Sequence, residues 1–240
     1  MPSPHDQIGA QIARMIPSDA VVVVQSELAS HVAQRRHLYL DTISPCLSGV
    51  DYIFADTRRP WYTYREPGWQ TLFRSPWFIT VVENDGYVLR QRLPDLKLDV
   101  PASAQFNRRL TLVGYTVPLM HTLSGGEAVH VLTGWQISQT FVQRYTLEYS
   151  VYDGAGHLWV QVTHEPCQGI RPTNQWKPGQ VNYDDVFLRL PPTMPSGDYT
   201  LTLAVYADVN QGALEARDAL GRALGTEIEI ATLPVSKNKQ

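Results

Sequence analysis

The sequence predicts an α+β protein of two domains, a small three-layer α/β unit followed by an immunoglobulin-like antiparallel β-sandwich. Two observations support this fold class. From Arg109 onward, apolar and polar residues alternate between turn-forming Gly, Pro and Asp residues. The first part combines a helical pattern, a continuous apolar run and a hairpin signal. We place the domains at 1–95 and 109–235, with a linker at 96–108 and a tail at 236–240.

The first domain begins with a helix signal. Ser3 can cap a helix whose first position is Pro4, and Asp6 follows three residues after the cap. Apolar residues then recur at helical spacing until Pro17. A strand at 20–24 and a short helix at 27–35 follow. Two further strands are predicted at 37–40 and 51–55, and a hairpin of 77–82 with 87–90 closes the domain. Their order suggests a small, mostly parallel sheet.

The second domain contains about seven predicted strands. They lie at 110–117, 128–137, 145–152, 157–163, 181–190, 199–206 and 227–233. The corner Pro195-Ser196-Gly197-Asp198 opens the strand that starts at Tyr199, and it suggests a tyrosine corner in which the Tyr199 hydroxyl bonds nearby backbone. Trp135 shares the parity of apolar neighbours, which predicts a core position.

Composition narrows the classes of function. The chain has 240 residues, 43% hydrophobic residues and a net charge of -3, so nucleic acid is not an expected partner. Its longest apolar run, at 20–24, is far shorter than the roughly 18 residues of a membrane span. The first ten residues show no signal-peptide pattern, although the chain can equally begin within a longer polypeptide. We expect Cys46 and Cys167 to be independent buried thiols.

Two sets of residues are candidates for ligand binding. Glu27, His31 and Arg35 recur every four residues, so they can line one helix face and hold a phosphate or a sugar hydroxyl; the alternative is a solvated face with ion pairs. Trp159 and Trp176 are the second set, as a carbohydrate platform or as covers for strand edges. The aromatic and arginine-rich stretch 58–78 suits a membrane interface, a sugar-stacking surface or simple packing.

Signals for catalysis and metal binding are weak. Asp153, Asp184, Asp185 and Asp208 make an oxygen-only calcium site conceivable, but no calcium-loop pattern supports it. Glu165 and Asp185 can be proposed as the carboxylate pair of a glycoside hydrolase, although their spacing does not single them out. We therefore expect no catalytic residues, no metal and no cofactor.

Several short motifs together resemble a known family. They include Ile16-Pro17-Ser18-Asp19, Asp51-Tyr52-Ile53-Phe54-Ala55-Asp56 and Asn84-Asp85-Gly86-Tyr87 in the first half, and Gly169, Trp176, Pro178-Gly179, Pro195 and Gly197 in the second. In this order they resemble the soluble C-terminal region of a bacterial family of uncharacterised, predicted multi-span membrane proteins. That family is distantly related to glycosyltransferases that use lipid-linked sugars.

The resemblance implies an accessory role. The chain would be a noncatalytic extracytoplasmic module on a bacterial membrane, whose partner is the upstream transmembrane region of the same polypeptide or another membrane protein. The transferase site would lie in that upstream region, so no residue here inherits it. The module would contact a glycan or a lipid-linked sugar. Two alternatives stay open, an independent carbohydrate-binding module and a glycoside hydrolase.

Overall fold

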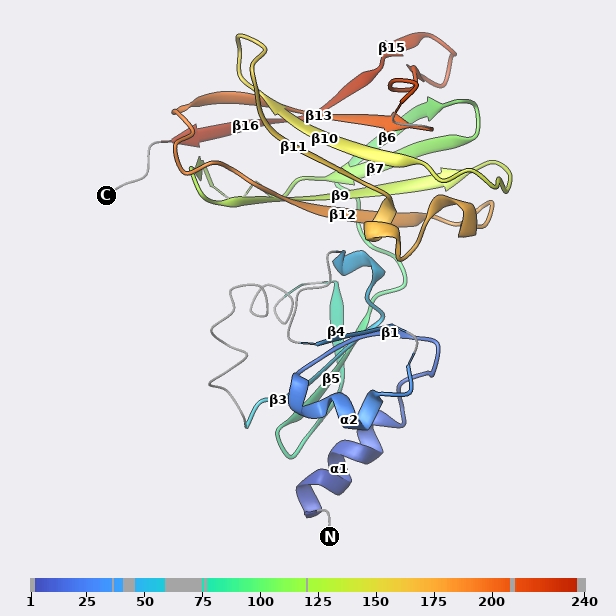
Figure 1. The fold of residues 1–240 in the computed structure, drawn as a ribbon, viewed down its shortest axis with the longest axis vertical. Coiled ribbons are helices and arrows are strands. Elements are labelled where there is room, and N and C mark those ends of the chain that lie inside the picture. The colour runs from blue at the N-terminus through green and yellow to red at the C-terminus, as the bar shows by residue number, and fades with distance from the viewer. Residues whose placement is uncertain are drawn as a thin grey trace. The chain divides into compact units, whose positions relative to one another are not determined.

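The computed structural model describes residues 3–35, 37–40, 46–58, 75, 77–119, 121–207 and 210–236 (Figure 1). The chain divides into two compact units, 1–96 and 97–240. Among the described residues, no helix has the length and apolar character needed to cross a membrane.

The first unit is built on one mixed sheet. Its elements are α1 (Pro4–Ala13), β1 (Val21–Val24), η1 (Ser26–Leu28), α2 (Ala29–Val32), β2 (His37–Leu40), η2 (Leu47–Gly49), β3 (Tyr52–Asp56), β4 (Phe78–Asn84) and β5 (Tyr87–Arg92). The strand order is β2-β1-β3-β5-β4. β1 runs parallel to β2 and β3, whereas β5 runs antiparallel to β3 and β4. The sheet is thus half antiparallel, because the hairpin adds both of its strands at one side.

Helix α1 forms where the capping signals predict it. The Ser3 hydroxyl accepts a hydrogen bond from the Asp6 backbone N–H at 3.1 Å, and the Ser3 backbone N–H donates to the Asp6 carboxylate at 2.9 Å, which makes a capping box. Ile12 and Ala13 pack with Val22, Val24 and other residues of one sheet face, in a cluster that also contains Leu28 and Val32. Both helices therefore serve the same apolar face.

The hairpin turn between β4 and β5 has the geometry that its residues favour. Asp85 and Gly86 both adopt positive φ, at 51° and 87°. Two consecutive positive φ values define the type I′ turn, whose twist matches a two-residue hairpin. This confirms the hairpin signal of the sequence.

The second unit packs two sheets face to face. Its strands are β6 (Val100–Phe106), β7 (Leu110–Thr116), β8 (Leu123–Ser124), β9 (Ala128–Ile137), β10 (Thr146–Tyr152), β11 (Leu158–His164), β12 (Asn182–Arg189), β13 (Gly197–Tyr206), β14 (Ala216–Arg217), β15 (Ala223–Gly225) and β16 (Glu227–Ser236), with η3 (Pro166–Gly169) and η4 (Thr173–Gln175) between them. One sheet has the order β11-β10-β13-β16-β8 and the other β12-β9-β7-β6-β14-β15. The predicted β-sandwich is present, and its apolar core draws on both sheets.

One predicted boundary differs from the structure. Residues 100–106, which we expected within a linker, form strand β6 and pair with β7. Pro101 suggested irregular backbone, and the pairing with β7 does shift its register between Pro101 and Ala104. The strand therefore tolerates a residue that normally argues against one.

Two side-chain predictions in the sandwich are confirmed. Trp135 is fully buried in the core. The Tyr199 hydroxyl donates a hydrogen bond to the Pro195 carbonyl at 2.9 Å, so it does tie back to the nearby corner.

The expectation of two free thiols is wrong. Cys46 and Cys167 are fully buried, as expected, but neither is a free thiol. The prediction rested on the distance between the two cysteines along the sequence. That distance does not tell whether a cysteine is oxidised once the chain is folded.

Candidate functional site

The outward side of the sheet β11-β10-β13-β16-β8 carries a varied group of polar side chains, most of them exposed or partly exposed. In β10, Leu147, Tyr149 and Val151 are buried in the core, so the residues between them face outward. We call the following residues the outer face: Glu148, Ser150, Tyr152, Gln161, Thr163, Thr202, Ala204, Tyr206, Glu227 and Glu229. Most are at least partly exposed, whereas Ser150 and Ala204 are 2% exposed and form its floor.

Strand register aligns two glutamates across this face. Glu148 lies opposite Ala204, and Ala204 lies opposite Glu227 on the next strand. Since neighbouring strands are about 4.8 Å apart, the two glutamate backbones are separated by about 10 Å, with the small Ala204 side chain between them. Glu148 and Glu227 therefore lie on either side of the small Ala204 side chain.

Hydroxyl groups hold both carboxylates in place. Glu148 accepts hydrogen bonds from the Tyr206 hydroxyl at 2.8 Å and the Thr163 hydroxyl at 2.9 Å. Glu227 accepts from the Tyr152 hydroxyl at 3.3 Å and the Thr202 hydroxyl at 2.9 Å. A carboxylate has about four acceptor positions, so each keeps acceptor capacity for a ligand.

The field of the two acids reaches both tyrosines. Partial burial raises the pKa of Tyr206 to about 12, helped by the hydrogen bond to Glu148 and by the charges of Glu148 and Glu227. Burial also raises the pKa of Tyr152, and the same two charges add to it. The tyrosine hydroxyls therefore stay protonated as donors near neutral pH. Strands β10, β11, β13 and β16 contain no Lys or Arg that would neutralise the acids.

A buried polar network lies inside the sandwich. The Tyr149 hydroxyl donates to the Asp184 carboxylate at 3.0 Å and lies 3.0 Å from the Thr133 hydroxyl, which also accepts from the Trp135 indole N–H at 2.8 Å. The Cys167 backbone N–H donates to Asp184 at 2.7 Å. Burial raises the pKa of Asp184 and raises that of Tyr149 well above its usual range. Because its members are closed off from solvent, this network ties the two sheets together and offers no site for a substrate.

Glu165 and Asp185, the carboxylate pair suggested for hydrolysis, are each paired with a different basic side chain. Asp185 is fully buried and lies 3.0 Å from His130 Nε2, whereas Glu165 pairs with Arg144. Each acid thus has its own partner. Among the suggested calcium ligands, Asp153, Asp184 and Asp185 do not gather into one group of ligand oxygens, and Asp208 lies outside the described residues.

The helical triplet predicted for ligand binding is divided between elements. Glu27 is exposed in η1, and His31 lies in α2. Arg35 follows α2, and its guanidinium donates to the carbonyls of Ala13 at 2.8 Å and Ile16 at 2.6 Å. Burial lowers the pKa of Arg35. Arg35 therefore caps the carboxyl end of α1 and turns toward backbone.

The two tryptophans also turn inward. The Trp159 indole N–H donates to the Asp153 carboxylate at 3.1 Å, and its ring meets the Tyr199 ring edge-on with centroids 6.0 Å apart. Trp176 is 4% exposed and donates to the Arg171 carbonyl at 2.8 Å. Most of the aromatic stretch 58–78 lies outside the described residues.

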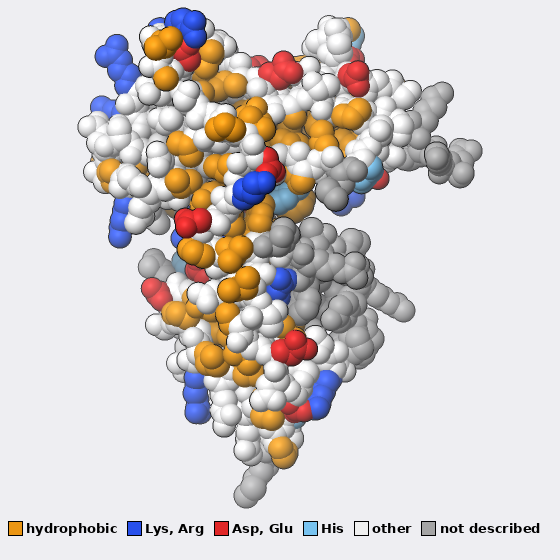
Figure 2. Space-filling model, turned by 180° about the vertical axis from the view of Figure 1, so that it is seen from behind, with side chains coloured by type: hydrophobic (Ala, Val, Ile, Leu, Met, Phe, Trp, Pro, Cys, Tyr) orange, Lys and Arg blue, Asp and Glu red, His pale blue; other side chains and the backbone are white. Residues whose placement is uncertain are grey.

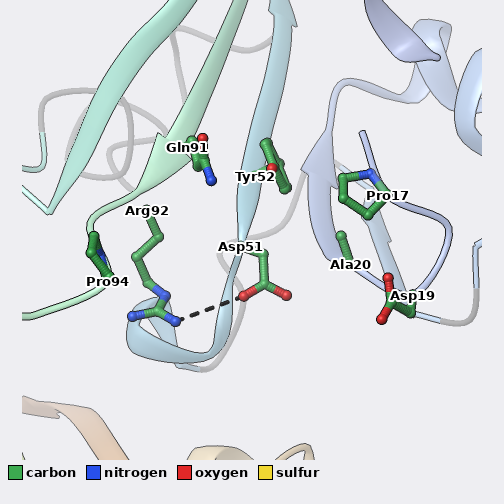
Figure 3. A pocket seen from close by; sticks show the side chains of 8 residues that line it. All are labelled: Pro17, Asp19, Ala20, Asp51, Tyr52, Gln91, Arg92 and Pro94. Atoms are coloured by element: carbon green, nitrogen blue, oxygen red, sulfur yellow. Dashed lines mark ion pairs between the residues drawn. The ribbon is translucent and has the colours of Figure 1, made fainter. Parts of the chain in front are cut away.

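The first unit has a separate cavity of about 400 Å³ (Figure 3). It is lined by Pro17, Asp19, Ala20, Asp51, Tyr52, Gln91, Arg92 and Pro94. Asp51 accepts a hydrogen bond from the Val21 N–H at 2.9 Å and pairs with Arg92 at 3.8 Å. The cavity lies where β1 and β3 begin, whereas ligands of parallel sheets usually bind at the carboxyl ends. We therefore favour the outer face.

Sequence reasoning missed the outer face. Its signal was present, because Glu148, Tyr152 and Tyr206 occupy the polar positions of alternating strands. Glutamate is depleted in strands, so a glutamate within each of the segments predicted as strands at 145–152 and 227–233 was a signal for a polar surface. In the view of Figure 2, the described Lys and Arg side chains are scattered among acidic and apolar ones.

Comparisons with known proteins give limited information. No protein-family model matches the chain, and no curated protein matches it. Among solved structures, the C-terminal domain of wzt has 13% identity and a TM-score of 0.38, over 62% of this chain and 90% of that domain. A β-glucuronidase from Bacteroides uniformis has 11% identity and a TM-score of 0.31, over 58% of this chain and 17% of that chain. A Niemann-Pick type C2 protein from the Japanese carpenter ant has 9% identity and a TM-score of 0.28, over 60% of this chain and 99% of that chain. Similarity at this level says nothing about function. The proposal below therefore rests on the residues of this chain.

Proposed function

We propose that the second unit is a noncatalytic module that binds a glycan on its outer face. The observation that carries this proposal is the pair Glu148 and Glu227, held by hydroxyl groups on either side of Ala204. A sugar presents several hydroxyl donors and acceptors on a flat ring, and the face offers carboxylate acceptors, hydroxyls, the Gln161 amide and two tyrosine rings.

Charge defines the class of glycan. Three glutamates lie on the outer face, and the strands that carry it, β10, β11, β13 and β16, contain no Lys or Arg. A uronic acid, phosphate or sulfate group would meet uncompensated negative charge there. A neutral glycan, or one that carries a free amine, fits the face. The amine would gain from the charge of Glu148 or Glu227.

Binding explains the two acids better than hydrolysis does. A glycoside hydrolase needs two carboxyl groups in different environments, so that one stays protonated while the other is ionised. Glu148 and Glu227 have matching hydrogen-bond partners, since each accepts from one tyrosine hydroxyl and one threonine hydroxyl. Such symmetry suits two acceptors in a binding surface.

The cellular role follows from the sequence resemblance. We propose that the module is the extracytoplasmic accessory part of a glycosyltransferase-like membrane protein, and that its partner is the upstream membrane region or another membrane protein. Sequencing the natural gene tests this role. Membrane helices encoded upstream of residue 1 would support it, and a short gene without them would contradict it.

The binding proposal is tested by calorimetric titration with four soluble oligosaccharides. These are a chitin, a chitosan, a cellulose and a polygalacturonate fragment of equal length. We expect saturable binding of at least one neutral or amine-bearing fragment and no binding of the polygalacturonate. Replacing both acids, in Glu148→Gln with Glu227→Gln, removes two charge-assisted interactions and should weaken binding by about 10-fold to 100-fold.

Matched variants locate the binding site. Ala204→Leu should fill the floor and abolish binding, while Glu215→Gln, at an exposed acid paired with Arg217 outside this face, should leave binding unchanged. Thermal unfolding of each variant confirms that it folds. Loss of binding in Trp159→Ala with retention in Ala204→Leu would move the site to the tryptophan. Turnover of a chromogenic glycoside, abolished by a single acid substitution, would replace the proposal with a hydrolase.

A further inference from the structure

A histidine in the first turn of α1 bridges two carboxylates from other parts of the first unit. His5 Nε2 lies 3.0 Å from Asp56 Oδ2, and His5 Nδ1 lies 2.7 Å from Asp85 Oδ2. Asp56 ends strand β3, and Asp85 lies in the turn between β4 and β5. One side chain thus joins the amino end of the helix to two separate points of the sheet.

The receiving carboxylates are held firmly. Asp56 is 1% exposed, and its backbone N–H donates to Gln25 Oε1 at 2.7 Å while Gln25 Nε2 donates to its carbonyl at 3.3 Å. The turn that carries Asp85 is fixed by Thr57, whose backbone N–H and hydroxyl both donate to the Gly86 carbonyl at 2.8 Å. Arg58 pairs with the second oxygen of Asp85. Both acceptor residues are therefore positioned by contacts in addition to those with His5.

Packing places the imidazole with little freedom. The His5 ring stacks on Tyr87 with centroids 4.3 Å apart, and Tyr87 stacks on Phe54 at 5.7 Å. A Cβ atom at Gly9 would lie 2.6 Å from the Tyr87 ring, so α1 rests directly on the same tyrosine. Contact of helix, tyrosine and sheet couples the state of His5 to the position of α1.

We propose that His5 is a pH-sensitive latch that holds α1 against the sheet. The imidazolium form has two N–H donors and satisfies both carboxylates. The neutral form has one, so one carboxylate then faces a ring nitrogen lone pair. Among the described residues, the charged or titratable groups that face the ring are Asp56 at the end of β3, Arg58 just after it, Asp85 in the turn between β4 and β5, and Tyr87 of β5. On α1 itself, the Asp6 carboxylate is turned to the Ser3 cap, and His31 of α2 adds a weaker charge effect on Asp6.

The sign of the pH dependence follows from the bonds. The hydrogen bond to Asp56, then that to Asp85, raises the pKa of His5 above 6.5. The latch is therefore fully formed below pH 6.5 and is lost as the pH rises through the raised value. The hydrogen bond to His5, with Arg58 nearby, lowers the pKa of Asp85 below 3.8, so the contribution of Asp85 is present above 3.8 and is lost as the pH falls through the lowered value. α1 should be held most firmly between these limits and should loosen toward alkaline pH.

Hydrogen exchange of the whole chain tests the latch. Peptides covering residues 3–16 are followed by mass spectrometry at about pH 5.5 and about pH 8.5, with intrinsic exchange rates corrected. We expect the protection of α1 to fall severalfold at the higher pH while that of β9 stays constant. His5→Gln should show low α1 protection at both values. His157→Gln, which changes an exposed histidine paired with Asp153 in the second unit, should behave as the wild type.

Two further measurements separate the latch from simple packing. Gly9→Ala should lower α1 protection at both pH values, because the added Cβ would clash with the Tyr87 ring against which both α1 and His5 pack. In the wild type, the NMR titration of the His5 ring should give a pKa above 6.5. Equal α1 protection at the two pH values, a wild-type response in His5→Gln, or a His5 pKa at or below 6.5 would each overturn the proposal. The NMR result decides the question even where His5→Gln does not fold.

Discussion

Two buried tyrosines of the sandwich should respond in opposite ways to the same substitution. Tyr149 and Tyr145 are both fully buried in the core of the second unit. The Tyr149 hydroxyl bonds the Asp184 carboxylate and the Thr133 hydroxyl, each at 3.0 Å. The Tyr145 hydroxyl has no hydrogen-bond partner among the described residues. Replacing each by Phe removes one buried oxygen and leaves the ring in place.

The contacts set the expected magnitudes. Tyr149→Phe removes a hydrogen bond to a buried carboxyl group, which typically contributes about 1.5 to 3 kcal/mol, so we expect a loss of about 2 kcal/mol in the free energy of unfolding. Tyr145→Phe removes a hydroxyl that is desolvated without compensation. Its ring keeps the edge-on contact with Phe141 at 5.0 Å. We therefore expect no loss, and a gain of up to about 1 kcal/mol.

Urea unfolding followed by circular dichroism measures both changes. With a slope of about 2 kcal/mol per molar urea, Tyr149→Phe should lower the midpoint by about 1 M, and Tyr145→Phe should leave it unchanged or raise it. The two variants serve as controls for each other, since the chemical change and the burial are the same. Equal destabilisation by both substitutions, or a larger loss in Tyr145→Phe, would refute the reasoning from hydrogen-bond partners.

Three other predictions concern glycines, a turn carboxylate and the tyrosine corner. Gly125→Ala should destabilise the sandwich by about 1 to 3 kcal/mol, because its Cβ would lie 2.6 Å from the Pro192 carbonyl oxygen. Gly154→Ala, where the Cβ meets open space, should leave the stability unchanged. Thermal unfolding measures both, and similar effects of the two substitutions would contradict this. Backbone N–H donation from His157, then the Trp159 indole, lowers the pKa of Asp153 to about 2, so stabilisation by Asp153 should be present above pH 3.8 and vanish toward pH 2, and an NMR midpoint near 3.8 would argue against it. Tyr199→Phe should cost about 1 kcal/mol in urea unfolding through loss of the bond to Pro195, and an unchanged midpoint would show that the bond contributes nothing.

The elements that the sequence alone predicted best are those with one buried face. Residues 199–206 alternate clearly because Tyr199, Leu201, Leu203 and Val205 all enter the core, and β13 spans them. Helix α1 was also predictable, since its capping box is local. Strand β6 was missed because Pro101 argues against a strand when its place at a register shift is unknown.

The candidate site was harder to predict because it depends on register between distant strands. Glu148 and Glu227 become neighbours of Ala204 only through two strand pairings, and each looks like an ordinary surface acid when considered alone. His5 contacts Asp56 and Asp85, which lie 51 and 80 positions further along the chain. Helical spacing instead favoured Arg35 as a ligand-binding residue, but its guanidinium donates hydrogen bonds to the backbone carbonyls of Ala13 and Ile16.

The position of β16 has a consequence for synthesis of the chain. This strand, residues 227–236, pairs with β13 on one side and with β8 on the other. While a ribosome is still making it, β13 presents a bare edge of backbone N–H and C=O groups. Such an edge readily accepts a strand from another nascent molecule. Premature termination just before Glu227 should therefore yield aggregates rather than a smaller folded sandwich.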